Sequence, residues 1–172
     1  GKVIYIKKIA NGEIPISTKK KRHYTLLDLT QTNLLSNAAY QVGIEMSYLD
    51  VHVNRAPIEG KISYINHIKG KFKSLKVSGA IFENERSIMI IDGSQVSIGL
   101  VLIASRLVRM IVAFVKKNDR VKQGKRIGKI RFGSQVDIII PNVAGLKILV
   151  NVNQYVKAGL DKIARIQESS NQ

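Results

Sequence analysis

The chain has 172 residues, of which 45% are hydrophobic, and it has no cysteine, which excludes disulfide frameworks, thiolate metal sites and cysteine nucleophiles. Only three histidines are present, which disfavours a histidine-rich metal centre, and we expect no metal. The formal net charge is +16, and residues 1–133 hold 24 Lys and Arg against 9 Asp and Glu, so this part should attract anionic partners.

Runs of isoleucine and valine recur along the chain, bounded about every 8 to 12 residues by Gly, Asn, Asp or Pro, which is typical of a barrel or sandwich. Leucines in residues 24–36 predict the one helix of any length. The fold class is therefore mainly β, barrel- or sandwich-like, with at most a short helix, and residues 1–172 should form a single domain. We predict strands near 2–8, 40–48, 60–66, 77–82, 87–92, 96–103, 107–115, 126–132, 135–140 and 146–150.

Four consecutive basic residues, Lys19 to Arg22, precede the predicted helix. A solvated loop is one interpretation, and contact with anionic lipid headgroups is the more specific one. Only Tyr24 offers a nearby ring for base stacking, and no recognition motif accompanies it, so we expect no nucleic-acid partner. No uncharged apolar run is long enough to cross a bilayer, so we expect membrane contact to be peripheral.

Asp50, His52 and Asn54 alternate along the segment that continues to Arg55. In a strand, alternate residues point to one face, so the three side chains would lie together. A carboxylate near a histidine can orient its ring and tune its pKa, as acid–base catalysis requires. A structural histidine at a strand end is the alternative interpretation.

Two segments repeat the order valine, two residues, glycine, then a strand: Val121 to Gly124, and Val156 to Gly159. Together they resemble the paired hairpins of barrel-sandwich hybrids, although two unrelated turns would look the same. No lysine stands at a hairpin tip, which disfavours a lipoyl or biotin carrier. A further polar group, Glu83 to Arg86, separates two apolar runs and is typical of a hairpin loop.

Gly133 and Ser134 lie between two strong strand patterns. Glycine has no Cβ, so its carbonyl carbon can be approached closely, and the following hydroxyl can attack it to convert the amide into an ester. β-Elimination would leave dehydroalanine, which hydrolyses to an N-terminal pyruvoyl group. The same tetrapeptide, Gly-Ser-Gln-Val, also begins at Gly93, so the pair alone does not identify a cleavage site.

In combination, these segments resemble the phosphatidylserine decarboxylase family, above all its short archaeal and bacterial branch, which includes archaetidylserine decarboxylase. The resemblance covers residues 43–164 most clearly. It rests on the motifs His52-Val53-Asn54-Arg55-Ala56-Pro57, Gly70-Lys71-Phe72, Asn84-Glu85-Arg86, Gly124 to Gly128, and Phe132-Gly133-Ser134-Gln135-Val136-Asp137 with Pro141.

The resemblance implies a self-processing decarboxylase. The chain would cut itself into 1–133 (β chain) and 134–172 (α chain), and Ser134 would become a pyruvoyl cofactor that forms a Schiff base with a phospholipid serine headgroup. His52, with Asp50, would serve as acid, base or carboxylate-positioning group. Asn54, Arg55, Asn84 and Arg86 would bind the substrate.

The resemblance also implies a peripheral location on the cytoplasmic side of the membrane, with an anionic surface as partner; assembly into a homo-oligomer is left open. Three positions depart from the pattern. Arg55 stands where larger relatives have a second histidine, Ala104-Ser105 replaces Ala-Gly, and Gly1 matches the glycine of an Asp-Gly pair whose Asp would precede it. The alternative is a processing-dead paralogue that binds lipid headgroups.

Overall fold

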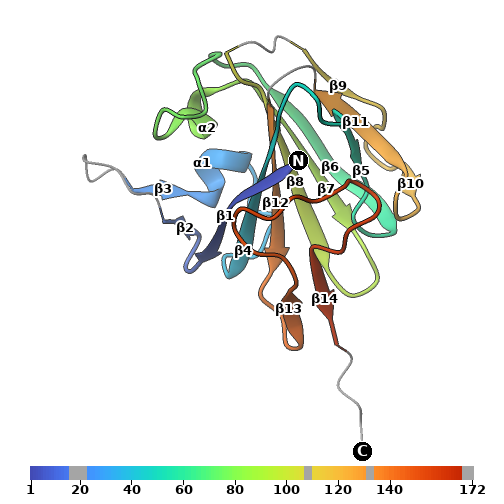
Figure 1. The fold of residues 1–172 in the computed structure, drawn as a ribbon. Helices are drawn as coiled ribbons and strands as arrows, with labels where there is room; N and C mark the ends of the chain where they lie inside the picture. Colours follow the sequence, from blue (N-terminus) through green and yellow to red (C-terminus); the bar gives the residue numbers. More distant parts are fainter. Residues whose placement is uncertain (16–22, 107–109, 131–133, 168–172) are drawn as a thin grey trace, which may run out of the picture.

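The computed structural model describes residues 1–15, 23–106, 110–130 and 134–167. Two short helices and fourteen strands occur in these ranges (Figure 1). They are β1 Lys2–Ile9, β2 Glu13–Ile14, β3 Tyr24–Thr25, α1 Leu26–Thr30, β4 Ala39–Met46, β5 Val53–Arg55, β6 Gly60–Ile68, α2 Ala80–Glu83, β7 Arg86–Asp92, β8 Ser97–Ile103, β9 Ile111–Ala113, β10 Arg120–Val121, β11 Arg126–Ile130, β12 Ser134–Pro141, β13 Leu146–Ile148 and β14 Ala164–Ile166.

Seven strands form one antiparallel sheet in the order β1-β4-β12-β8-β7-β6-β10, and three more form a second sheet, β5-β11-β9. The strand pairs β13-β14 and β2-β3 complete the described sheets, none of which closes into a barrel. The prediction of a mainly β fold with short helices is therefore confirmed.

Apolar side chains fill both faces of the central strands β8 and β7, whereas β12 is apolar on one face and carries Gln135 and Asp137 beside Ile139 on the other. On one face, Leu102 and Val136 share a core with Ile127 and Ile130 of the three-stranded sheet. On the other face, α1 and α2 contribute to a second core, in which Leu29 packs with side chains of β7 and β8. Burial on both faces explains why β7 and β8 contain nearly continuous apolar runs.

The helix predicted over residues 24–36 is much shorter than expected. Thr25 caps α1, because its hydroxyl accepts the Asp28 N–H while the Asp28 carboxylate accepts the Thr25 N–H. The helix ends at Gln31, which adopts the left-handed conformation at φ 54°. The following residues, Thr32 and Asn33, are weak helix formers, so nothing local extends it.

The strand predicted near 77–82 is wrong. Gly79 has φ +80° and begins α2 in its place, so the segment makes a turn and one helical turn. Tyr24 stacks on Phe82 with ring centroids 4.1 Å apart, which holds α2 against β3. The other predicted strands coincide with observed ones where they are described. For the range 107–115, β9 covers Ile111–Ala113, and residues 107–109 lie outside the described part of the chain.

The two predicted valine–glycine turns share one local structure. Gly124 and Gly159 both have positive φ, +82° and +83°, and Val121 and Val156 are both buried in the core between the sheets. The repeated pattern therefore identified two equivalent turns correctly. Neither helix of the described ranges is long and apolar enough to cross a membrane.

Candidate active site

Ser134 is the first residue of β12, at the centre of the large sheet. It lies opposite Met46 at the end of β4, and the next residue, Gln135, lies opposite Ile103 at the end of β8. Strand ends on both sides therefore fix the position of its backbone. Gly133, the predicted partner in the cleavage, lies outside the described residues.

The Ser134 hydroxyl is buried and has no hydrogen-bond partner among the described residues. Side chains alternate along a strand, so Ser134 shares a face of β12 with Val136 and Ile138, both of which belong to the core beneath the three-stranded sheet. A buried hydroxyl without a partner costs about 1–3 kcal/mol. A buried polar group without a partner requires an explanation, and a catalytic role is one such explanation.

His52 lies beside the strand that leads to Ser134. Its backbone carbonyl accepts the N–H of Ile130, the last residue of β11, 3.1 Å away. Its Nε2 atom is buried. The pairing of β5 with β11 thus brings His52 close in space to a segment nearly eighty positions later in the chain.

Asp50 does not share a strand face with His52, so this part of the prediction is wrong. Residues 48–50 form a turn, and β5 begins only at Val53. The Asp50 carboxylate accepts the Ser47 N–H and hydroxyl at 2.7 and 2.8 Å. Partial burial would raise the pKa of Asp50, but the two hydrogen bonds from Ser47 hold it below its usual value.

Asn54 and Arg55, both predicted to bind substrate, have different surroundings. Asn54 is buried, and its Nδ2 group has no hydrogen-bond partner among the described residues, so it could donate to a ligand. Arg55 lies between the two repeated turns: its Nη1 donates to the Gly124 carbonyl at 2.8 Å, and its side chain packs against Gly159.

Asn84 and Arg86 are buried at the same end of the large sheet as Ser134. Arg86 lies opposite Ile103, two strands and so about 10 Å from β12. Its guanidinium donates to the backbone carbonyls of Asp28, Leu29, Phe82 and Asn84. The Asn84 amide bonds the backbone of Lys73 and Ala104. These contacts hold α1, α2 and the end of β8 together, and a direct substrate contact stays a prediction.

A buried polar cluster that sequence reasoning missed lies on the opposite face of β12. The Asp137 carboxylate accepts hydrogen bonds from Tyr5 at 2.7 Å, Gln41 at 2.6 Å and Gln135 at 2.6 Å. The Gln135 amide also donates to the Tyr5 hydroxyl. Asp137 and Gln135 were part of the family motif, and polar residues at alternate positions of an apolar strand were the signal that could have identified the cluster.

The electrostatics of this cluster follow from its burial. Desolvation raises the pKa of Asp137, while the bonds from Gln135, Tyr5 and Gln41 and the charge of Lys7 act in the opposite direction. Burial and the neighbouring Asp137 carboxylate also raise the pKa of Tyr5. Burial lowers the pKa of Lys7, whose ammonium lies 4.5 Å from the centre of the Tyr5 ring.

Gly43 makes this cluster possible. Tyr5 belongs to β1 and Asp137 to β12, and β4 runs between these two strands. The Tyr5 ring lies directly against Gly43 of β4, where any Cβ would collide with it. The absence of a side chain at Gly43 therefore lets Tyr5 reach across one strand to the next.

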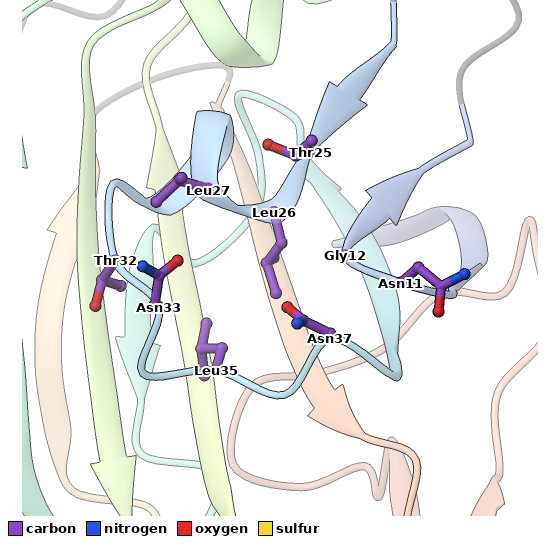
Figure 2. A pocket seen from close by; sticks show the side chains of 9 residues that line it. All are labelled: Asn11, Gly12, Thr25, Leu26, Leu27, Thr32, Asn33, Leu35 and Asn37. Atoms are coloured by element: carbon purple, nitrogen blue, oxygen red, sulfur yellow. The ribbon is translucent and has the colours of Figure 1, made fainter.

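A cavity of about 180 Å³ lies away from these residues (Figure 2). It is near the start of β4, where Ala39 faces Pro141 at the far end of β12 from Ser134. Seven residues of strand separate the two ends, about 23 Å. We assign no site there. Its lining residues are Asn11, Gly12, Thr25, Leu26, Leu27, Thr32, Asn33, Leu35 and Asn37.

Comparison with known proteins identifies relatives of this chain. The family model of phosphatidylserine decarboxylase matches residues 1–164. A putative archaetidylserine decarboxylase proenzyme from Methanocaldococcus jannaschii is 42% identical over 95% of this chain and 77% of its own length. A phosphatidylserine decarboxylase proenzyme from Erythrobacter litoralis is 43% identical over 75% of this chain.

The matched region is only part of several relatives. It covers 51% of the Erythrobacter protein and 52% of a putative archaetidylserine decarboxylase proenzyme from Methanothermobacter thermautotrophicus, which is 40% identical over 70% of this chain. The family match nevertheless includes Ser134, His52 and the strands that position them. The chain therefore belongs to the phosphatidylserine decarboxylase family, a family of enzymes.

Proposed function

We propose that this chain is a proenzyme that cuts itself between Gly133 and Ser134 and then removes carbon dioxide from the serine headgroup of a phospholipid. The proposal is supported by relatives that are named decarboxylase proenzymes, because a proenzyme must be processed and a decarboxylase removes carbon dioxide. The serine lipid is phosphatidylserine or archaetidylserine, which share one headgroup and differ in how their hydrocarbon chains are attached.

The observation that carries the proposal is the Ser134 hydroxyl. It is buried at the start of a central strand and has no hydrogen-bond partner among the described residues. It is therefore neither solvated nor engaged in a structural contact there, and it is adjacent in sequence to the carbonyl that it must attack. A residue that only closed a turn would be exposed, as Ser94 is.

Self-cleavage needs no external reagent except water. The Ser134 oxygen bonds to the Gly133 carbonyl carbon, and the bond from that carbon to the Ser134 nitrogen breaks, which gives an ester. Removal of the Ser134 α-proton then breaks the ester bond, leaving a Gly133 carboxylate and a dehydroalanine. Water adds to the tautomeric imine, and ammonia leaves, so residue 134 carries a pyruvoyl group.

A carbonyl oxygen at residue 134 is compatible with a buried position at which the Ser134 hydroxyl has no hydrogen-bond partner among the described residues. A ketone there supplies the electron sink for loss of a carboxylate. His52, which lies beside the end of β11, positions the substrate carboxylate or moves a proton. The buried Asn54 amide donates a hydrogen bond to the headgroup. Asn84 and Arg86 hold α1, α2 and the end of β8 together at the same end of the sheet as Ser134.

The two products of cleavage remain one protein in this proposal. Residues 1–133 supply the strands on both sides of β12, and residues 134–172 supply β12 itself. The assembled protein acts on its lipid as a peripheral protein on the cytoplasmic side of the membrane. Its positive charge is concentrated in residues 1–133, which suits an anionic surface.

Intact-mass measurement of the denatured protein tests the proposal. We expect two chains, ending at Gly133 and beginning at residue 134, the smaller with a blocked N-terminus. Cyanoborohydride with a serine phospholipid should then trap the lipid amine on the smaller chain, and hydroxylamine should abolish activity. A single intact chain from the complete native protein would contradict the enzyme assignment and favour a lipid-binding paralogue.

A further inference from the structure

The connection between β4 and β5 exposes several large apolar side chains. Leu49 is 98% exposed, Val51 71% and Tyr48 59%. Single exposed leucines are common on protein surfaces, but three large apolar side chains within four residues are not. Leu49 is almost as exposed as a side chain can be, so this turn carries its apolar tip away from the rest of the molecule.

The turn is held in shape by hydrogen bonds. The Asp50 carboxylate accepts both the N–H and the hydroxyl of Ser47, and the Asp50 N–H donates to the Ser47 carbonyl at 3.1 Å. These contacts close residues 47–50 into a compact loop. Leu49 is therefore presented outward by an ordered backbone.

This turn lies at the end of the sheet that carries Ser134. The last residue of β4, Met46, is directly opposite Ser134. The connection that follows β8, on the other side of β12, includes the exposed Met110. The β6–β7 connection at the same end includes the exposed Val77 (Figure 1).

Basic side chains accompany these apolar ones. Lys69 and Lys76 are exposed on the β6–β7 connection, and Arg106 is exposed just after β8. Two more lysines on the same connection, Lys71 and Lys73, form ion pairs with Glu83 at 2.9 and 2.8 Å. Lys69, Lys76 and Arg106 form no ion pair among the described residues, so apolar and free basic side chains share this end of the sheet, as on surfaces that insert among anionic headgroups.

We propose that this end of the sheet docks on an anionic bilayer, with Leu49 and Val51 inserted among the lipids and with Lys69, Lys76 and Arg106 on the headgroups. The proposal rests on the proposed function, because a lipid substrate gives Ser134 a reason to face a membrane. It assigns the docking to the rim of the site and not to the basic run from Lys19 to Arg22, which lies outside the described residues.

A bilayer suits this surface better than a second copy of the chain. A stable protein interface buries about 800 Å² on each partner and is depleted in lysine at its centre. A three-residue apolar tip accompanied by basic side chains offers less apolar area than that, and two such ends would repel each other. An anionic lipid surface accepts both features at once.

The chain contains no tryptophan, so Leu49→Trp creates a single fluorescent reporter. The full chain would be mixed with vesicles containing phosphatidylglycerol and, separately, with vesicles of phosphatidylcholine alone. We expect a blue shift and quenching by brominated lipid with the anionic vesicles only, weakening as salt rises. Leu49→Glu should lower vesicle binding on the order of tenfold or more.

Leu160 provides the matched control, because it is 76% exposed on a turn that packs near Arg55, at the end of β5 away from His52. Leu160→Trp should show no blue shift, and Leu160→Glu should bind vesicles like the wild type. Sedimentation of Leu49→Glu without lipid is the second control. If the wild-type chain sediments as a dimer and the Leu49→Glu variant as a monomer, the turn is a contact between copies and the proposal is overturned.

All binding measurements are repeated in a Ser134→Ala background, which separates this proposal from the proposed function. Insertion of the Leu49→Trp reporter into the bilayer, in a chain that never cuts itself, supports the docking surface even if the enzyme assignment fails. A cleaved, active Leu49→Trp protein that binds anionic vesicles without a change in its tryptophan emission overturns the docking surface alone, and it directs attention to residues 19–22.

Discussion

The tetrapeptide Gly-Ser-Gln-Val occurs twice, and the two copies have opposite surroundings. The first, beginning at Gly93, closes the hairpin between β7 and β8; the Gly93 N–H donates to the Val96 carbonyl, and Ser94 is exposed to water. In the second, Ser134 begins a central strand and is buried on all sides. Identical local chemistry thus becomes a turn in one place and a candidate reactive group in the other.

The residue that follows each tetrapeptide separates the two copies in sequence. Ser97 follows the first and begins β8, whereas Asp137 follows the second and is the acceptor for three buried hydrogen bonds. Those bonds come from β1, β4 and β12 itself. The second copy is therefore held by contacts that no window of local sequence contains.

The largest contrast is expected from removing each serine hydroxyl. Ser134→Ala should abolish chain cleavage completely, because no oxygen remains to attack Gly133. Ser94→Ala should cleave at the wild-type rate, since its hydroxyl faces solvent. Denaturing gels and intact mass on freshly purified protein measure both. Cleavage of the Ser134→Ala variant would show that another nucleophile acts at this junction.

A substitution of His52 tests whether this residue, which lies near the segment leading to Ser134, serves decarboxylation or chain cleavage. His52→Ala should lower the decarboxylation rate by about 10²- to 10⁴-fold, the usual contribution of an acid–base group. Chain cleavage should be affected less. His67→Ala is the matched control. His67 is an exposed residue of β6, and its Nε2 atom lies 3.1 Å from a carboxylate oxygen of Glu85. A His52→Ala variant that never cleaves would transfer this residue to processing.

Asp137→Asn tests the buried polar cluster around Asp137. The substitution is made in a Ser134→Ala background, so that the unfolding of a single uncleaved chain is measured. Burial raises the folded pKa of Asp137 above the unfolded value of about 3.9. The folded protein therefore holds this proton more tightly, and the stability linked to it is present at low pH and lost as pH rises through the folded pKa.

Urea unfolding of both proteins from about pH 4 to pH 7 measures this effect. The free energy of unfolding of the protein that keeps Asp137 should decline, relative to that of the Asp137→Asn variant, as pH rises. At low pH the Asp137→Asn variant should be less stable by about 1–3 kcal/mol, because an amide cannot accept all three bonds. Parallel curves for the two proteins would mean that Asp137 titrates alike in the folded and unfolded states.

Arg55→Met should have the smallest effect. The variant keeps the aliphatic packing against Gly159 but loses the bond to the Gly124 carbonyl, which should cost about 1–2 kcal/mol of unfolding free energy. Arg120→Met, at an exposed position of β10, should change stability by less than about 0.5 kcal/mol. Equal effects at both positions would show that Arg55 does not connect the two repeated turns.

Local patterns alone identified most of the sheet. Strands β1, β4, β6, β7, β8, β11 and β12 were predictable because β-branched runs bounded by turn residues have few other stable forms. The equivalent turns at Gly124 and Gly159 were predictable because both need a positive φ that glycine adopts without strain. The family motifs likewise selected Ser134 over Ser94 before any contact was known.

Only the tertiary structure decided which residues meet. Strand pairing places His52 beside β11, and it brings Tyr5, Gln41 and Asp137 together from three strands. It also engages Arg86 with backbone carbonyls and places Asp50 in a turn before β5. Sequence sets each residue's local preference, but pairing energy and burial are shared between distant segments, so the site appears only when the sheet has formed.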